Sequence, residues 1–122
     1  MRRPLPTSEA FQVVRVPFPF SDRLAVKRRP AVVLSKPGFQ LGSGHLLLAM
    51  VTTADQSTWP LDWRIVNLKA AGLKQPCLIR MKLFTLDERL LLEPLGKLAI
   101  VDQKGLASRL ADLLAMPRLT SA

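Results

Sequence analysis

The sequence predicts a mainly β protein, a small antiparallel barrel or rolled sheet followed by one C-terminal helix. Short apolar runs follow one another at close spacing, with turn residues between them. No stretch alternates strand and helix patterns as parallel βαβ units do. Near the C-terminus, Leu106, Leu110, Leu113 and Leu114 recur at helical spacing, which predicts one amphipathic helix.

The first two strands are expected between Val13 and Ser35. From residue 13 to residue 20, apolar residues at even positions alternate with a set that includes Arg15, which predicts one buried face with Arg15 on the other. The apolar run 31–34 predicts a strand buried on both sides. Pro30 can occupy only its first position, because proline donates no ladder hydrogen bond. Arg29 is therefore expected at the mouth of the sheet, with its guanidinium free.

Further strands are expected at 45–53, 61–66, 77–84 and 91–98, the last confined to an edge by its proline and glycine. Residues 36–44 are expected to be a connection rich in turn residues. In the strand 77–84, Arg80 and Lys82 share a face. Thr85 is expected to cap a helical turn, and Asp102 to cap the C-terminal helix.

Length and charge predict one globular domain with polyanionic partners. The 122 residues fit a loose arm (1–10), a single domain (11–116) and a frayed tail (117–122). Lys and Arg number 18 against 9 Asp and Glu, a net charge of +9, which favours nucleic acid or an acidic protein segment as a partner. A basic surface kept only for solubility is the alternative on charge alone.

The sequence lacks the residues that several classes of chemistry require. Cys77 is the one cysteine, which excludes a disulfide framework within the chain. Because it starts an apolar strand, we expect a buried, inert thiol. His45 is the one histidine, expected at an exposed strand edge, and the acids show no metal-ligand spacing. No metal and no cofactor are expected. The longest apolar run, Leu46–Val51, is too short for a signal peptide or a membrane span, so we expect a cytoplasmic protein with no membrane contact.

What remains is a set of cations and hydroxyls near the strand ends: Lys27, Arg28, Arg29, Thr52, Thr53, Arg80 and Lys82. Such a set suits a phosphodiester. RNA carries its own nucleophile, the 2′-hydroxyl, so an enzyme that orients the phosphate and stabilises the developing charge can cut it without a metal. A guanidinium can bind two phosphate oxygens at once. A solvated turn is the competing interpretation of residues 27–29.

These residues lie in segments that resemble the MazF/PemK-like toxins of bacterial type II toxin–antitoxin systems. The matching segments stand in the family's order and spacing over residues 11–116: VPFPFSD (16–22), KRRPAVVLS (27–35), LLLAMVTT (46–53), AGLKQPCLIRMKLFTLD (71–87) and LGKL (95–98). Any one segment would be weak evidence, but together they are specific.

The resemblance implies an SH3-like, CcdB/PemK-type barrel of five to seven short strands, working as a homodimer. It also implies an endoribonuclease, an mRNA interferase that cuts single-stranded RNA at short motifs without metal, and an acidic cognate antitoxin. The family's catalytic arginine and threonine fall on Arg29 and Thr52. We expect RNA contacts from Lys27, Arg28, Ser21, Asp22, Thr53, Arg80 and Lys82.

The sequence departs from the family at one place and leaves two alternatives open. Family members commonly begin the first strand with Gly-Asp, where this chain has Phe11 and Gln12. An inactive RNA-binding relative is therefore one alternative. The other is a CcdB-like toxin that binds a topoisomerase without catalysis, because the fold alone does not decide between them. Arg29 together with Thr52 favours the nuclease.

Overall fold

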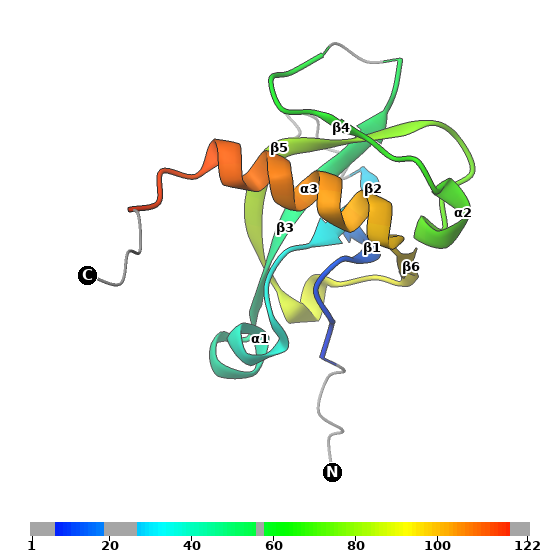
Figure 1. The fold of residues 1–122 in the computed structure, drawn as a ribbon. Helices are drawn as coiled ribbons and strands as arrows, with labels where there is room; N and C mark the ends of the chain where they lie inside the picture. Colours follow the sequence, from blue (N-terminus) through cyan, green and yellow to red (C-terminus); the bar gives the residue numbers. More distant parts are fainter. Residues whose placement is uncertain (1–6, 19–26, 56–57, 118–122) are drawn as a thin grey trace.

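The computed structural model describes residues 7–18, 27–55 and 58–117 (Figure 1). In chain order, the elements of this part are β1 (Gln12–Pro17), β2 (Arg28–Val33), α1 (Pro37–Ser43), β3 (His45–Thr53), β4 (Trp63–Arg64), α2 (Leu68–Ala71), β5 (Cys77–Asp87), the 3₁₀ turn η1 (Glu88–Leu90), β6 (Pro94–Lys97) and α3 (Ile100–Leu113). The mainly β class with a C-terminal helix is confirmed. The end of the first predicted strand, at residues 19 and 20, lies outside the described residues.

The strands form one antiparallel sheet in the order β4-β5-β3-β2-β1-β6. The sheet curls into a half-barrel, and α3 crosses one of its faces beside β4 and β5 (Figure 1). β6 lies at an edge of the sheet, as its proline predicts. Within the described residues, no helix has the length and apolarity needed to cross a bilayer.

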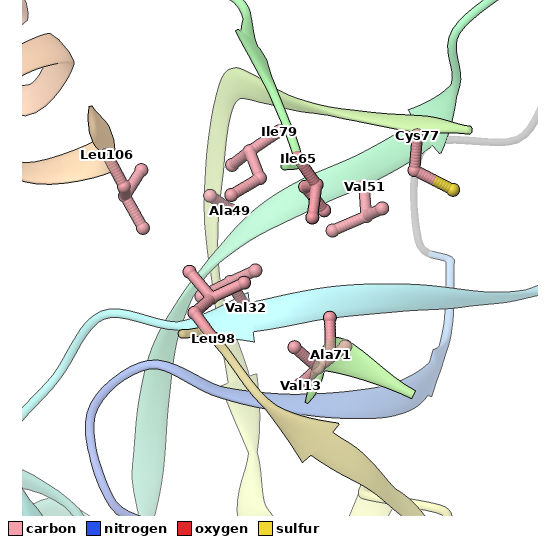
Figure 2. Packing of buried hydrophobic residues seen from close by; sticks show 10 residues of the cluster. All are labelled: Val13, Val32, Ala49, Val51, Ile65, Ala71, Cys77, Ile79, Leu98 and Leu106. Atoms are coloured by element: carbon pink, nitrogen blue, oxygen red, sulfur yellow. The ribbon is translucent and has the colours of Figure 1, made fainter. Parts of the chain in front are cut away.

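Both faces of this sheet are buried. The helix face packs against α2 and α3, and its core consists of Val13, Val32, Ala49, Val51, Ile65, Ala71, Cys77, Ile79, Leu98 and Leu106 (Figure 2). The opposite face, here called the Arg29 face, has a core made of Val14, Val16, Phe18, Ala31, Val33, Leu46, Leu48, Phe84 and Leu86. Neighbouring residues of a strand enter different cores because side chains alternate. The expectation of a single buried face for β1 is therefore wrong, since Val13 is fully buried.

β5 shows the alternation that its sequence predicts. Its odd-numbered residues from Cys77 to Leu83 pack into or against the helix-face core, and Phe84 packs into the other core. Arg80 and Lys82 therefore lie on the Arg29 face. β5 is longer than expected and pairs with the whole of β3, with a register shift at the step between residues 49 and 50. This long pairing runs from His45 and Asp87 at one end of the two strands to Thr53 and Cys77 at the other.

Three segments of the chain differ from their predictions. Residues 37–43 form α1, which starts at Pro37 and ends at Gly44 in the left-handed region (φ 73°), a pairing of start and stop residues that favours a short helix. The fourth predicted strand shrinks to Trp63–Arg64. The turn after β5 is capped by Asp87, whose carboxylate accepts a hydrogen bond from the Arg89 amide (2.9 Å), because the strand continues through the position predicted as the cap.

Asp102 has a different role from the predicted cap. α3 begins at Ile100, and Asp102 lies inside its first turn, where it is fully buried. Its carboxylate accepts hydrogen bonds from Trp63 Nε1 (2.9 Å), the Val66 amide (2.7 Å) and the Asn67 amide (3.0 Å). This carboxylate therefore ties α3 to the segment that follows β4.

Trp63 also explains a glycine in α3. A Cβ at position 105 would lie 2.2 Å from the Trp63 ring, so only Gly105 allows the helix to approach this closely. The Arg109 guanidinium, one turn further along α3, also lies over this ring, 5.2 Å from its centre. The predicted leucine stripe packs through Leu106 and leaves Leu114 half exposed. The buried residues of α3 are thus Asp102, Gly105 and Leu106.

Replacing Asp102 tests this connection. Asp102→Ala leaves three donors without their acceptor, and we expect the free energy of unfolding to fall by about 3 kcal/mol. Urea denaturation monitored by circular dichroism measures it. Asp112→Ala, an exposed carboxylate on the same helix, should change stability little. Equal losses in the two variants would contradict the assignment.

Candidate functional site

The candidate site begins where the pairing of β2 with β3 ends. That pairing runs from Val33↔Leu48 to Ala31↔Met50, directly after Pro30, which has no amide hydrogen to donate. Two residues further along each strand stand Arg29 and Thr52. By strand alternation their side chains leave the sheet on the same face as those of residues 31 and 50. The two residues expected to be catalytic therefore lie on one face of adjacent strands.

Phe18 gathers two cations on this face. The Arg29 guanidinium carbon lies 5.7 Å from the centre of the Phe18 ring, and Lys82 Nζ lies 5.6 Å from the same centre. The ring is itself held edge-on by Phe84, with centroids 6.1 Å apart. Both distances are typical of cation–π contacts. Two cations that share one ring create a positive potential suited to a phosphate.

Arg29 keeps its hydrogen-bonding capacity for a ligand. Among the described residues, no carboxylate lies within ion-pair distance of its guanidinium. Thr52 lies opposite Leu78 of β5 and is only 5% exposed, so packing restricts where its hydroxyl can lie. A fixed hydroxyl near a guanidinium fork can orient and bind the oxygens of a phosphodiester.

Arg80 occupies a different environment from the exposed cation expected. Its side chain is 7% exposed and forms a two-pronged ion pair with Asp62, with Nη2 to Oδ2 at 3.0 Å and Nε to Oδ1 at 3.2 Å. Its guanidinium carbon lies 5.1 Å from the centre of the Trp59 ring. Asp62 also accepts a hydrogen bond from the Trp59 amide (2.8 Å). Arg80 thus holds the segment after β3 onto the sheet.

The remaining expected residues lie around a pocket of about 700 Å³ at the same end of the sheet. It is lined by Arg15, Lys27, Arg28, Arg29, Pro30, Val51, Thr52, Thr53, Gly72, Leu73, Lys74, Gln75, Cys77 and Leu95. Arg28 and Thr53 belong to the helix face, because each is one residue away from a residue of the Arg29 face. The cations expected in one cluster are therefore divided between the two faces. Ser21 and Asp22 lie outside the described residues.

Cys77 and His45 lie in environments typical of residues without a chemical role. Burial raises the pKa of the Cys77 thiol, which keeps it protonated and unreactive at neutral pH. His45 is exposed at the end of β3, as predicted, and its Nδ1 lies 3.0 Å from the Ser43 carbonyl oxygen. No group of three or more His, Cys, Asp or Glu side chains among the described residues could hold a metal ion.

Sequence reasoning missed the residues that organise the site. Phe18 was predicted only as a core residue, although it contacts both Arg29 and Lys82. The partner of Arg80, Asp62, is 18 positions away in a polar connection. No local pattern signals either contact, because both depend on how the sheet curls.

Comparison with protein families now identifies the chain. The family model of the PemK-like, MazF-like toxin of type II toxin–antitoxin systems matches residues 9–114, most of the chain. The protein belongs to this family. The resemblance seen in its sequence segments is thereby confirmed. None of the curated proteins compared matches this MazF-like toxin significantly.

Solved structures share the fold of this MazF-like toxin. A MazE–MazF complex from Deinococcus radiodurans (Form III) superposes with a TM-score of 0.72 at 20% identity, over 91% of this chain and 99% of the other. An endoribonuclease in complex with its cognate antitoxin from a mycobacterial species gives 0.71 at 16% identity, over 91% and 98%. The Mycobacterium tuberculosis toxin MazF-mt6 gives 0.67 at 17% identity, over 83% and 93%. These comparisons establish the shared fold.

The ion pair of Arg80 in this toxin can be tested by a double-mutant cycle. Asp62→Ala leaves a buried guanidinium without its carboxylate, and we expect a loss of about 3–5 kcal/mol in the free energy of unfolding. Adding Arg80→Leu removes the unpaired charge and should restore part of that loss. Urea denaturation of the four proteins measures the coupling. A coupling energy near zero would show that Arg80 does not depend on Asp62.

Proposed function

We propose that this toxin is an endoribonuclease that cuts single-stranded RNA, mRNA included, at short sequence motifs without a metal ion. The observation that carries the proposal is the gathering of Arg29 and Lys82 over the Phe18 ring, on the face to which Thr52 belongs. This arrangement offers a guanidinium fork, a point charge and a packed hydroxyl to one phosphate. Solved structures with this fold include proteins described as endoribonucleases, which supports the proposal.

The reaction needs no nucleophile from the protein. The 2′-hydroxyl of the RNA loses its proton and attacks the adjacent phosphorus, the bond to the 5′-oxygen breaks, and that oxygen gains a proton. The products are a 2′,3′-cyclic phosphate end and a 5′-hydroxyl end. A guanidinium group is a poor base, so the role of Arg29 is to bind the non-bridging oxygens as negative charge develops. Thr52 orients the phosphate or the 2′-hydroxyl.

Phe11 and Gln12, which stand where family members commonly have Gly-Asp, lie away from the proposed catalytic residues, and this supports an active enzyme. Phe11 adopts φ 70°, in the left-handed region that glycine occupies most easily. Gln12 pairs with Lys97 at the start of β1, whereas Arg29 pairs with Val16, four residues on. At the rise of a strand, this separates Gln12 from the Arg29 position by roughly 13 Å. The replacement therefore lies at the beginning of β1, away from Arg29 and its neighbour Val16.

The proposal includes a homodimer. The described residues leave several large apolar side chains exposed, among them Ile100, Val101, Leu114 and Met116 on and after α3. A chain of 13.6 kDa hides such surface most easily against a second copy. Sedimentation at micromolar concentration should give twice the mass of the chain. A monomer alone would contradict this part of the proposal.

An acidic, flexible antitoxin segment is the proposed inhibitor. Solved structures with this fold include complexes of a toxin with its antitoxin, and this chain carries a net charge of +9. A segment of opposite charge laid across Arg29 and Lys82 would exclude RNA and would bind more weakly as salt rises. An antitoxin that binds as tightly when an uncleavable RNA fills the site would contradict this mode of inhibition.

Substitution of Arg29 tests the proposed catalysis. Arg29→Ala should lower the cleavage rate by about 10²- to 10³-fold, because it removes preorganised charge stabilisation. Arg29→Lys should recover little, since a point charge does not replace the fork. The rate of cutting of a long unstructured RNA measures both, with circular dichroism to verify folding.

Arg89→Ala is the matched control. Arg89 is 76% exposed and pairs with Asp87, which stands opposite His45 at the far end of β3 from Thr52. Its loss should leave cleavage unchanged, because exposed ion pairs contribute little. Cleavage by Arg29→Ala at the wild-type rate would reject the proposed role of Arg29.

A further inference from the structure

The proposed reaction leaves one role unassigned, that of the group which gives a proton to the departing 5′-oxygen. We infer that Lys82 is this group, the general acid that protonates the 5′-oxygen as its bond to phosphorus breaks. This role rests on the proposed function and goes beyond the positive charge that Lys82 offers to a phosphate.

Arg29, Thr52 and Lys82 come from three neighbouring strands. The sheet order places β3 between β2 and β5, and the three side chains belong to the Arg29 face. Arg29 and Lys82 therefore approach the site from opposite sides of Thr52. During in-line displacement, the attacking oxygen enters and the leaving oxygen departs on opposite sides of the phosphorus. A phosphate bound by Arg29 and Thr52 can therefore present its leaving oxygen to β5 and Lys82.

A β-bulge directs Lys82 toward the Phe18 ring. Residues 49 and 50 of β3 are neighbours, but their partners on β5 are residues 83 and 80, so β5 inserts residues 81 and 82 as extra residues in the ladder. Bulges of this kind bend a strand and redirect its side chains. Lys82 Nζ lies 5.6 Å from the centre of the Phe18 ring, which Arg29 also contacts. Because Phe18 is packed in the core of this face, it is a fixed support for both cations.

An ammonium group suits this step better than the other groups nearby. It carries a proton at neutral pH and releases it more readily than a guanidinium does, which leaves Arg29 to bind the developing charge. Lysine is among the side chains that serve as general acids, whereas a hydroxyl such as that of Thr52 is a much weaker acid. Among the described residues, the imidazole of His45 stands at the far end of β3, and the carboxylate of Asp62 is bound by Arg80.

The step balances in protons and electrons. As the 2′-oxygen bonds to phosphorus, its proton passes to water. The bond between phosphorus and the 5′-oxygen breaks with its electron pair on that oxygen, which takes a proton from Lys82 Nζ. The resulting amine regains a proton from water before the next turnover. The products are the 2′,3′-cyclic phosphate and the 5′-hydroxyl end of the proposed reaction.

A sulfur leaving group tests this role. The two substrates are an RNA oligonucleotide that the protein cuts at one position and a copy in which sulfur replaces the 5′-bridging oxygen there. A thiolate leaves without a proton, so the sulfur copy needs no general acid. Lys82→Gln should slow cleavage of the oxygen RNA by about 10²- to 10⁴-fold and should cut the sulfur copy at nearly the wild-type rate. Both rates are measured with the RNA saturated by protein and after subtraction of the protein-free rate.

Lys82→Arg separates the proton from the charge. Its guanidinium keeps the positive charge but is a poorer proton donor, so this variant should bind an uncleavable 2′-O-methyl RNA as the wild type does and still cut the oxygen RNA slowly. Arg29→Ala should slow both substrates, because either leaving group requires charge stabilisation at the phosphate. Lys104→Gln removes an exposed charge from α3 and is the matched control, which should cut both substrates as the wild type does.

Three outcomes would overturn the role of Lys82. Equal losses on the two substrates in Lys82→Gln would show that Lys82 supplies only charge or packing. Wild-type cleavage of the oxygen RNA by Lys82→Gln or by Lys82→Arg would show that another group donates the proton. In these cases the wild-type protein still cuts RNA, and the proposed function stands. A wild-type protein that cuts neither substrate would instead reject the proposed function and the role of Lys82 together.

Discussion

The end of hydrogen bonding between β2 and β3 is the constraint on which the candidate site depends. Pro30 cannot donate to a neighbouring strand, and the pairing stops at the next residue, Ala31. Arg29 and Thr52 are the residues just beyond this point on the two strands. Each remains held on its other side, β2 by β1 and β3 by β5. The strands therefore stay rigid while their ends open around a pocket, which combines precise placement with access for a polymer.

Burial divides the cations of this basic chain into two kinds. Arg80 is paired with Asp62 and covered by Trp59, and Arg109 lies against Trp63, so these guanidinium groups stabilise the fold. Arg29 lies against Phe18 instead, which orients it without neutralising its charge. Among the described residues, no carboxylate would have to be displaced before a phosphate binds Arg29. A net charge of +9 favours polyanionic partners, but the partners of each cation decide where a phosphate can bind.

The sequence predicted the elements that depend on local pattern. Alternation in β5 placed Lys82 correctly, and the proline and glycine of β6 placed that strand at an edge, because a strand pattern reports side-chain direction directly. The same pattern could not show that Val13 is buried, since α2 and α3 cover that face from elsewhere in the chain. Nor could it show that Asp102 accepts hydrogen bonds from the segment after β4, a contact between residues more than 30 positions apart. Local pattern thus placed Arg29 and Thr52 at strand ends, and the family resemblance predicted their catalytic role, whereas the contacts that hold the candidate site came only from the fold.

The central claim is that the RNA supplies the nucleophile and the protein supplies placement and charge. The most direct measurement uses an RNA oligonucleotide that the protein cuts at one position, and a copy with a single 2′-deoxy residue on the 5′ side of that position. With EDTA present, the account predicts that the all-ribose RNA is cut to a 2′,3′-cyclic phosphate end and that the substituted copy remains intact. Cleavage of the substituted copy at the same position, or loss of all cleavage when EDTA is added, would contradict it.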